Sequence, residues 1–259
     1  MTRIRKLFRI ITFPLLCLFD PRTAKLHFDR WVDRYNSTKF SKLNKLISLK
    51  VKMKTKNKRG LKINLACGDG WRCNGWIGID CKAAYPYENK EGMKGFGINW
   101  NLLNGLPFQN SSVKRIFISH FLEHVTYNES LKLLEECYRV LEPGGAIRIS
   151  VPDLDLYIEK LLEKDEAFFR DIEIAGGKWL GNLTDSFLMN FYSDPSYNNT
   201  CHKYAYNFEN LSCRLKQCGF KEIVRSSYMK SQFKEFNDKG LDSPNPKIPF
   251  FSLWVETVK

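Results

Sequence analysis

Residues 62–70 read KINLACGDG, an apolar run that two closely spaced glycines follow. The run predicts a buried strand, and Gly68 and Gly70 predict a tight turn at its carboxyl end. Glycine has no Cβ, so a ligand can approach the backbone closely there, and open α/β sheets bind ligands at the carboxyl ends of their strands. We therefore expect a ligand-binding loop, although a purely structural turn would have the same sequence.

A second apolar segment, residues 76–80, ends on Asp80. A carboxylate at the end of the second strand can accept hydrogen bonds from both hydroxyls of a ribose. The third glycine of a dinucleotide fingerprint is missing, and the short segment 71–75 replaces the helix whose N-terminus would face a pyrophosphate. The two segments therefore favour a nucleoside without phosphates over a nicotinamide cofactor.

The rest of the chain alternates expected strands with expected helices. One helix is expected over residues 128–141, where Pro143 and two glycines end it, a second from Asp153 to about Asp171, and a third over residues 208–218. Five further strands are expected at residues 97–101, 115–119, 146–151, 220–226 and 250–258. This order predicts an α/β fold: a Rossmann-like, seven-stranded, mostly parallel sheet with helices on both faces and an antiparallel C-terminal hairpin.

The net charge of +13 is concentrated at the N-terminus. Residues 1–60 hold 17 Lys and Arg against 3 Asp and Glu, whereas residues 61–259 are close to neutral. We therefore expect two parts: a basic, partly helical arm over residues 1–60, and a folded α/β body over residues 61–259 with an irregular insertion at about 172–205. Because the body is neutral, nucleic-acid binding by the whole protein is not expected.

The eight cysteines form no CxxC pair and no cluster with zinc-like spacing, so no metal site is expected and the thiols are interpreted as reduced and buried in a cytoplasmic protein. The apolar segment 10–19 is too short to span a bilayer. Residues 1–20 combine basic and apolar side chains, which suits peripheral contact with an anionic inner membrane surface. Packing of the same apolar face on the body or on a second subunit is the competing interpretation.

Four segments in a fixed order carry a resemblance to a known family. They read INLACGDG (63–70), GWIGID (75–80), NLLNGLPFQNSSVKRIFISHFLEHV (101–125) and LLEECYRVLEPGGAIRISVPD (133–153). The series resembles the class I methyltransferases that use S-adenosylmethionine (SAM), and in particular the small-molecule branch that includes ubiquinone/menaquinone-like and glycan-associated enzymes. The resemblance covers about residues 61–155 and, more loosely, 202–225.

The resemblance implies a SAM site along the strand ends. The positions that match the family's cofactor contacts are Asn64, Ala66, Gly68, Gly70, Asp80, Asn101, Leu102, Ser119 and His120. Gly68 and Gly70 would face the methionine part, Asp80 the ribose, and Asn101 with Leu102 the adenine. Asn64 and Asn101 stand where the family often has an acid, so weaker cofactor binding is expected.

On the acceptor side, three residues are candidates for the catalytic base: His120, Asp153 and His202. His120 ends a strand at the cofactor edge, and His202 lies in a stretch that resembles one covering the acceptor pocket in glycan-associated relatives. The competing interpretations are a helix N-cap for Asp153 and simple packing for His202. Glu123 and His124 match the family's LEH signature, and we interpret them as a helix cap and a packing residue.

The sequence therefore predicts SAM-dependent methyl transfer to a small-molecule or glycan-type acceptor, by direct in-line transfer without a metal. Two alternatives stay open. One is an RNA methyltransferase that uses the basic arm as an electrostatic handle. The other is a non-catalytic interaction protein with a SAM-binding fold.

Overall fold

The computed structural model describes residues 51, 53, 55–67, 75–80, 87–88, 94–174, 179–192, 202–238, 240–241 and 248–259. The chain divides into two units, Met1–Lys50 and Val51–Lys259, and every described residue lies in the second. Residues 1–50 of the basic arm, and with them the predicted membrane contact through residues 1–20, lie outside the described residues. So do Gly68 and Gly70.

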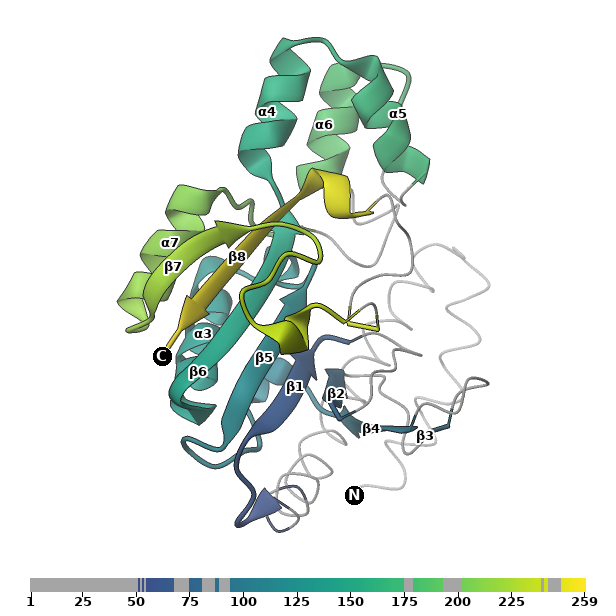
Figure 1. The fold of residues 1–259 in the computed structure, drawn as a ribbon. Coiled ribbons are helices and arrows are strands. Elements are labelled where there is room, and N and C mark those ends of the chain that lie inside the picture. Colours follow the sequence, from purple (N-terminus) through teal and green to yellow (C-terminus); the bar gives the residue numbers. More distant parts are fainter. Residues whose placement is uncertain are drawn as a thin grey trace, which may run out of the picture. The chain divides into compact units, whose positions relative to one another are not determined.

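The core of the described unit is one mixed sheet of eight strands (Figure 1). In spatial order they are β3 (Tyr87–Glu88), β4 (Lys94–Asn99), β2 (Ile77–Asp80), β1 (Leu61–Leu65), β5 (Val113–Ser119), β6 (Leu141–Pro152), β8 (Ser252–Val258) and β7 (Lys221–Ser226). The five strands from β4 to β6 are parallel, and β8 runs antiparallel to both β6 and β7. The sheet therefore has one strand more than predicted, the short β3, and the late antiparallel pair is present.

One face of the sheet packs against two helices, α3 (Tyr127–Val140) and α7 (Phe208–Gln217), which lie behind the strands in Figure 1. Thr126 begins α3 with a capping box: its hydroxyl accepts from the amide of Glu129, whose carboxylate accepts from the amide of Thr126. Glu123 is therefore not the cap that the sequence suggested. The apolar side of α3, with Leu134 and Cys137, is fully buried.

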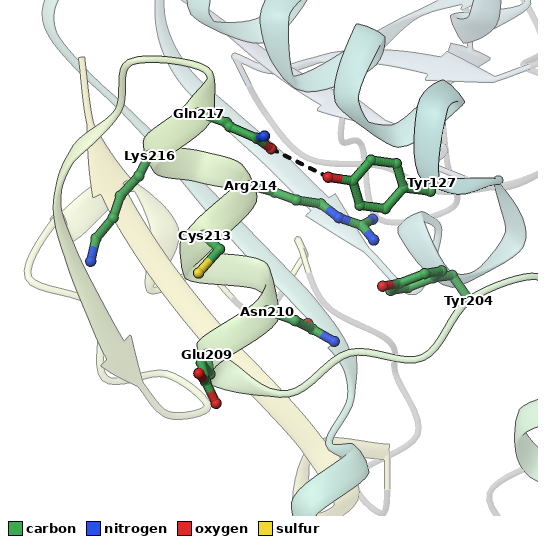
Figure 2. Close-up of a pocket in the computed structure, with 8 residues that line it drawn as sticks. All are labelled: Tyr127, Tyr204, Glu209, Asn210, Cys213, Arg214, Lys216 and Gln217. Carbon is green, nitrogen blue, oxygen red and sulfur yellow. Dashed lines mark hydrogen bonds between the residues drawn. The ribbon is translucent and has the colours of Figure 1, made fainter.

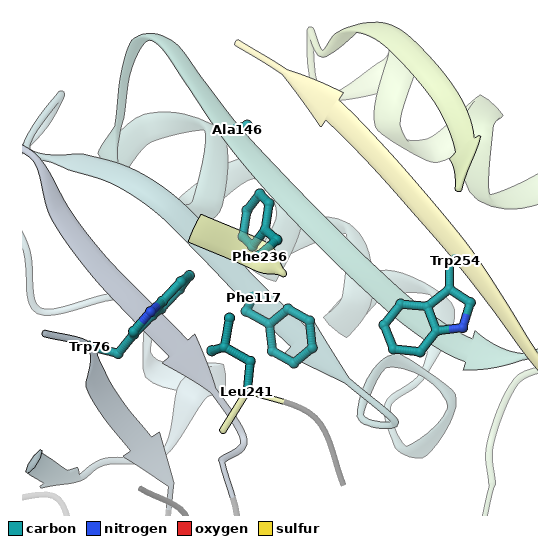
Figure 3. Close-up of a cluster of buried hydrophobic side chains, with 6 residues drawn as sticks. All are labelled: Trp76, Phe117, Ala146, Phe236, Leu241 and Trp254. Atoms are coloured by element: carbon teal, nitrogen blue, oxygen red, sulfur yellow. The ribbon is translucent and has the colours of Figure 1, made fainter. Parts of the chain in front are cut away.

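In the part of the chain that the structure describes, a loop rather than an α-helix covers part of the opposite face. Trp76, Phe117 and Trp254 from the sheet side pack against Phe236 and Leu241 (Figure 3). The only helical turn described here is the 3-10 turn η3 (Lys234–Phe236). The prediction of helices on both faces is therefore wrong for this part of the described chain, because aromatic side chains bury enough area without a regular helix.

Three helices form a group at the end of the sheet where β6 ends and β8 begins (Figure 1). They are α4 (Leu154–Leu162), α5 (Glu166–Ile174) and α6 (Leu183–Tyr192). The single helix expected to about Asp171 is interrupted because Lys164 takes a left-handed backbone (φ 56°). The segment predicted as irregular contains α6. No described helix has the length and apolar character needed to cross a membrane.

An aromatic cluster holds this group together. Tyr157, Phe168, Phe169 and Phe191 from the three helices pack with Phe251, which directly precedes β8. The ring of Tyr157 lies edge-on to all four, with centroid distances of 4.8 to 6.2 Å. The cluster fixes the helices against the sheet edge that carries the site described next.

Candidate functional site

The carboxyl ends of the central strands form one row of positions. Leu65 of β1 pairs with both Ile79 and Ile118, and Ile118 pairs with Ile149. The next position along each of these four strands therefore lies at the same edge of the sheet. The residues at these positions are Ala66, Asp80, Ser119 and Ser150. Three of them are predicted site residues, and Ser150 joins them through a 2.8 Å hydrogen bond between its hydroxyl and that of Ser119.

Two residues at this edge have left-handed backbones although neither is glycine. Ala66 directly follows β1 with φ 54°, and His120 directly follows β5 with φ 47°. Such conformations are costly for residues with a Cβ, and they occur preferentially where a site demands them. The two residues with strained backbones, Ala66 and His120, are therefore both among the site residues predicted from the sequence.

His120 is held at both ring nitrogens. Nδ1 lies 3.2 Å from Oε1 of Glu123, and Nε2 lies 2.9 Å from Oγ of Ser252. The nearby carboxylate favours a proton on Nδ1, and in that tautomer the lone pair of Nε2 accepts from the serine hydroxyl. About a quarter of the His120 side chain is exposed, and its ring packs edge-on to Phe251. No pattern in the sequence points to Ser252, because the residue comes from the late antiparallel strand.

Glu123 is buried in the 3-10 turn η2 (Leu122–His124), with 2% of its surface exposed. Burial raises the pKa of its carboxyl, but contact with His120 and the charges of the surrounding imidazoles outweigh it, and the pKa lies below its ordinary value. Glu123 is therefore an ionised group in an otherwise closed environment. The helix-cap interpretation of Glu123 from the sequence is therefore wrong.

His124 and His202 complete the surroundings of Glu123. Their rings meet edge-on with centroids 4.7 Å apart, and Nδ1 of His202 lies 2.6 Å from the carbonyl oxygen of Asn190 on α6. The backbone carbonyl of Glu123 accepts from the amides of Lys203 and Tyr204, so the His202 segment is tied directly to η2. Burial lowers the pKa of His202 despite the attraction of Glu123. This cluster could not be predicted from the sequence, because His202 is far from Glu123 and His124 along the chain.

Asp153 lies at the end of β6, where its backbone bridges to Tyr206. It occupies the N-cap position of α4, but its side chain makes no capping hydrogen bond. One carboxylate oxygen lies 3.7 Å from the guanidinium of Arg225, and burial raises the pKa of the carboxyl in spite of that charge. The N-cap interpretation is therefore not supported by its hydrogen bonds.

The predicted adenine-side residues take up local structural positions. The side-chain oxygen of Asn101 accepts from the amide of Leu103 at 3.0 Å and so caps the turn η1 (Leu102–Asn104). A carbonyl oxygen has a second lone pair, so this bond leaves an acceptor for a ligand amine. Leu102 is buried, and Asn64 is buried within β1. The donor and acceptor types along this edge fit a nucleoside.

A separate hollow opens beside α7 (Figure 2), and none of the predicted site residues lines it. Its floor is the buried guanidinium of Arg214, which lies 4.0 to 4.8 Å from the ring centroids of Tyr127, Tyr204 and Tyr206. The same guanidinium donates to the hydroxyls of Ser130 and Tyr206. The contacts of Arg214 join α7 to the start of α3.

Comparison with known proteins identifies the central part of this edge. Residues 80–149 match the family model described as a methyltransferase domain. This segment runs from the end of β2 through β5, η2 and α3 into β6, and therefore includes Asp80, Asn101, Ser119 and His120. No curated protein matches the chain.

The solved structures that match the chain have low sequence identity to it. A SAM-dependent methyltransferase from Archaeoglobus fulgidus is 16% identical, with 88% of this chain and 100% of that chain covered and a TM-score of 0.41. A SAM-dependent methyltransferase from Mesorhizobium loti is 14% identical, with 78% and 92% covered and a TM-score of 0.42. Identities of this size carry no information on the acceptor. Over residues 80–149, the chain is therefore similar to a methyltransferase domain.

Proposed function

We propose that the enzyme methylates a hydroxyl group of a small-molecule or glycan-type acceptor and that His120 is the catalytic base. One observation carries the proposal: Nδ1 of His120 faces the ionised Glu123, while Nε2 faces a hydroxyl, that of Ser252. The negative charge of a carboxylate next to Nδ1 stabilises the imidazolium form of the ring. Nε2 can then take a proton from a hydroxyl.

The proposed step balances without any further reactant. The acceptor oxygen gives its proton to Nε2 of His120 and forms the new O–CH3 bond as the S–CH3 bond breaks. SAM supplies an electrophilic methyl group on a sulfonium, so the step needs no metal. The uncharged thioether leaves, and the proton remains on His120 until solvent removes it.

The cofactor residues are proposed from their positions at the strand ends. Asp80 would hold the ribose, and Asn101 with Leu102 would hold the adenine. Ala66 directly follows β1, where the main chain would approach the ligand, and Ser119 lies between Ala66 and Ser150 in the row of strand ends. Gly68, Gly70 and Asn64 remain part of the proposal from sequence.

Asp153 and His202 are second and third candidates for the base. The raised pKa of Asp153 suits a group that exchanges protons, but only one of its carboxylate oxygens faces a charge, that of Arg225. Nδ1 of His202 faces a backbone carbonyl, and its ring packs on His124. His120 is preferred over both because its two nitrogens contact a carboxylate and a hydroxyl.

The basic arm supports a second proposal, on where the enzyme acts. The net positive charge of the chain is concentrated in residues 1–60, and residues 1–20 combine basic with apolar side chains. We propose a cytoplasmic enzyme whose arm contacts the anionic inner membrane surface, which suits a lipid-linked glycan acceptor. Flotation with anionic vesicles should be lost when residues 1–60 are deleted. Salt-sensitive RNA binding by the arm in place of flotation would favour the RNA methyltransferase instead.

A screen for labelled methyl transfer tests the main proposal. The full-length enzyme is incubated with methyl-labelled SAM and fractionated cell extract, and the labelled product is tested for a methyl ether. Calorimetry with S-adenosylhomocysteine gives the cofactor affinity in the same preparation. Label on protein or RNA, or on nitrogen or carbon, would contradict the proposed acceptor. Cofactor binding without any labelled product would favour the non-catalytic alternative.

A further inference from the structure

Three side chains that can ligate a metal meet beside the proposed base. Glu123 and His124 lie in η2, and His202 lies on the segment that precedes α7. One ligand atom from each can be chosen so that all three lie within 4.8 Å of one another. The sequence predicted no metal site because these residues have no zinc-like spacing along the chain.

The carboxylate in this cluster lacks the hydrogen bonds that a buried charge requires. Glu123 is 2% exposed, and among the described residues neither of its oxygens has a partner with hydrogen-bond geometry. His120 reaches Oε1 at 3.2 Å as an ion-pair contact only. Nδ1 of the adjacent His124 is also buried without a partner in the described part of the chain. Buried groups of this kind are stabilised by a counter-charge or a metal.

The orientation of His202 is typical of a metal-binding imidazole. A carbonyl oxygen can only accept, so the 2.6 Å contact with Asn190 places the proton of His202 on Nδ1. In the neutral ring the lone pair is then on Nε2. Histidine ligands commonly donate their other ring N–H to a backbone carbonyl in this way, which fixes both the tautomer and the ring orientation.

We propose that Glu123, His124 and His202 bind a divalent transition-metal ion of the zinc class. Two imidazoles and one carboxylate are a donor set that zinc prefers, and they leave a coordination position for water. Ligand atoms of a tetrahedral zinc site lie roughly 3.4 Å apart, given bonds of about 2.1 Å. The cluster therefore has to contract slightly when the ion binds.

The ion would have a structural role next to the proposed catalytic base. It would neutralise Glu123 and join η2 to the segment that leads into α7. It would also fix the carboxylate that orients His120. The proposal does not depend on the acceptor, because metal binding is measured on the protein itself.

Metal titration of the full-length protein tests this directly. The protein is stripped with a chelator, and Zn²⁺ and then Co²⁺ are added under calorimetric and optical detection. We expect one equivalent to bind with a tetrahedral or five-coordinate Co²⁺ spectrum that lacks the thiolate charge-transfer band. His202→Gln and Glu123→Gln should each lower the affinity by more than about 100-fold, above the usual cost of losing an outer-shell partner.

Cys213→Ser is the matched control, because Cys213 is an exposed thiol that could capture the ion by itself. Its metal affinity should equal that of the unaltered protein. Circular dichroism establishes that each variant is folded. Absence of stoichiometric binding to the folded, unaltered protein would overturn the proposal. So would a thiolate band, loss of binding in Cys213→Ser, or full affinity in both folded ligand variants.

Discussion

Two buried ionic clusters in this enzyme differ in how completely they are paired. Arg148 on β6 and Glu256 on β8 are each about 1% exposed and form a direct ion pair. Arg148 also donates to the hydroxyl of Ser226 and to the carbonyl of Ser227, and its guanidinium stacks on the ring of Trp254. This cluster satisfies its charges within the sheet.

The carboxylate of Glu123 is buried to nearly the same degree, but its charge is incompletely paired. It is surrounded by His120, His124 and His202, and in the described part of the chain neither oxygen has a well-formed hydrogen bond. A buried ionic cluster whose hydrogen bonds are all made contributes to the fold. A cluster whose charged oxygens lack hydrogen bonds can still bind a ligand or a proton. Buried charge alone therefore does not locate a site, but incomplete pairing does.

The largest effect is expected from His120→Gln. Loss of a positioned general base should lower kcat about 100- to 10,000-fold. Because His120 also matches a cofactor contact, the affinity for S-adenosylhomocysteine is measured on the same variant, and the loss of kcat is compared at saturating SAM. The measurement is labelled methyl transfer to the acceptor found in the screen. Turnover close to that of the unaltered enzyme would exclude His120 and direct attention to Asp153.

The next largest effect is expected at the cluster of Arg148 and Glu256, with Arg148→Met. This substitution leaves Glu256 buried without its partner, which should cost about 3–5 kcal/mol of unfolding free energy. Urea denaturation measures the loss. Adding Glu256→Leu should restore most of it, because apolar pairs often replace buried ion pairs without loss. A small loss of unfolding free energy in Arg148→Met alone would contradict the conclusion that this cluster contributes to the fold.

A smaller change in unfolding free energy is expected for Asp153→Asn, and it should stabilise the protein rather than destabilise it. The pKa of Asp153 is raised above its ordinary value of 3.8 by burial, so folding favours the protonated carboxyl. Its contribution to stability is present below pH 3.8 and is lost as pH rises through the raised pKa. Asp153→Asn should therefore stabilise the protein at pH 7 relative to the unaltered chain, and less so at acid pH. Denaturation at several pH values gives the comparison, and destabilisation at pH 7 would contradict it.

The smallest effect is expected at the left-handed residues. Lys164→Gly, between α4 and α5, should stabilise the protein by about 0.5–1 kcal/mol because glycine tolerates positive φ. Ala66→Gly should stabilise it by a similar amount. Urea denaturation measures both. Lys164 is exposed and distant in sequence from the site, so only Ala66→Gly should alter the affinity for S-adenosylhomocysteine. Equal affinity changes in both variants would show that strain at Ala66 has no local role.

The sheet was predictable because each strand is a short apolar run with a clear end. The strands predicted at residues 76–80 and 115–119 are β2 and β5, and α3 lies within one residue of its predicted bounds. The break at Lys164 and the helix α6 were not predicted. A left-handed backbone at lysine leaves no pattern in a single sequence. Helix α6 was missed because a run of polar residues follows it directly.

The site was predictable only where strand ends define it. Ala66, Asp80, Ser119 and His120 could be grouped because parallel strands bring their carboxyl ends to one edge. Ser252 and the contact between His124 and His202 could not be, since they depend on an antiparallel strand and on a loop packed across η2. Residues 228–241 carry aromatic side chains that resemble an ordinary loop until they are seen covering Phe117 and Trp254.

The position of β8 also has a consequence for how the chain is built on the ribosome. β8 lies between β6 and β7 in the sheet but follows β7 in the chain. When β7 emerges during synthesis, its only described neighbour in the sheet has not yet been made, and residues 227–251 must be added first. During that interval β7 is an unpaired edge that can associate with other nascent chains. Ser252 is the first residue of β8 and is added only when this interval ends. His120, the proposed catalytic base, therefore gains its hydroxyl partner only when β8 joins the sheet.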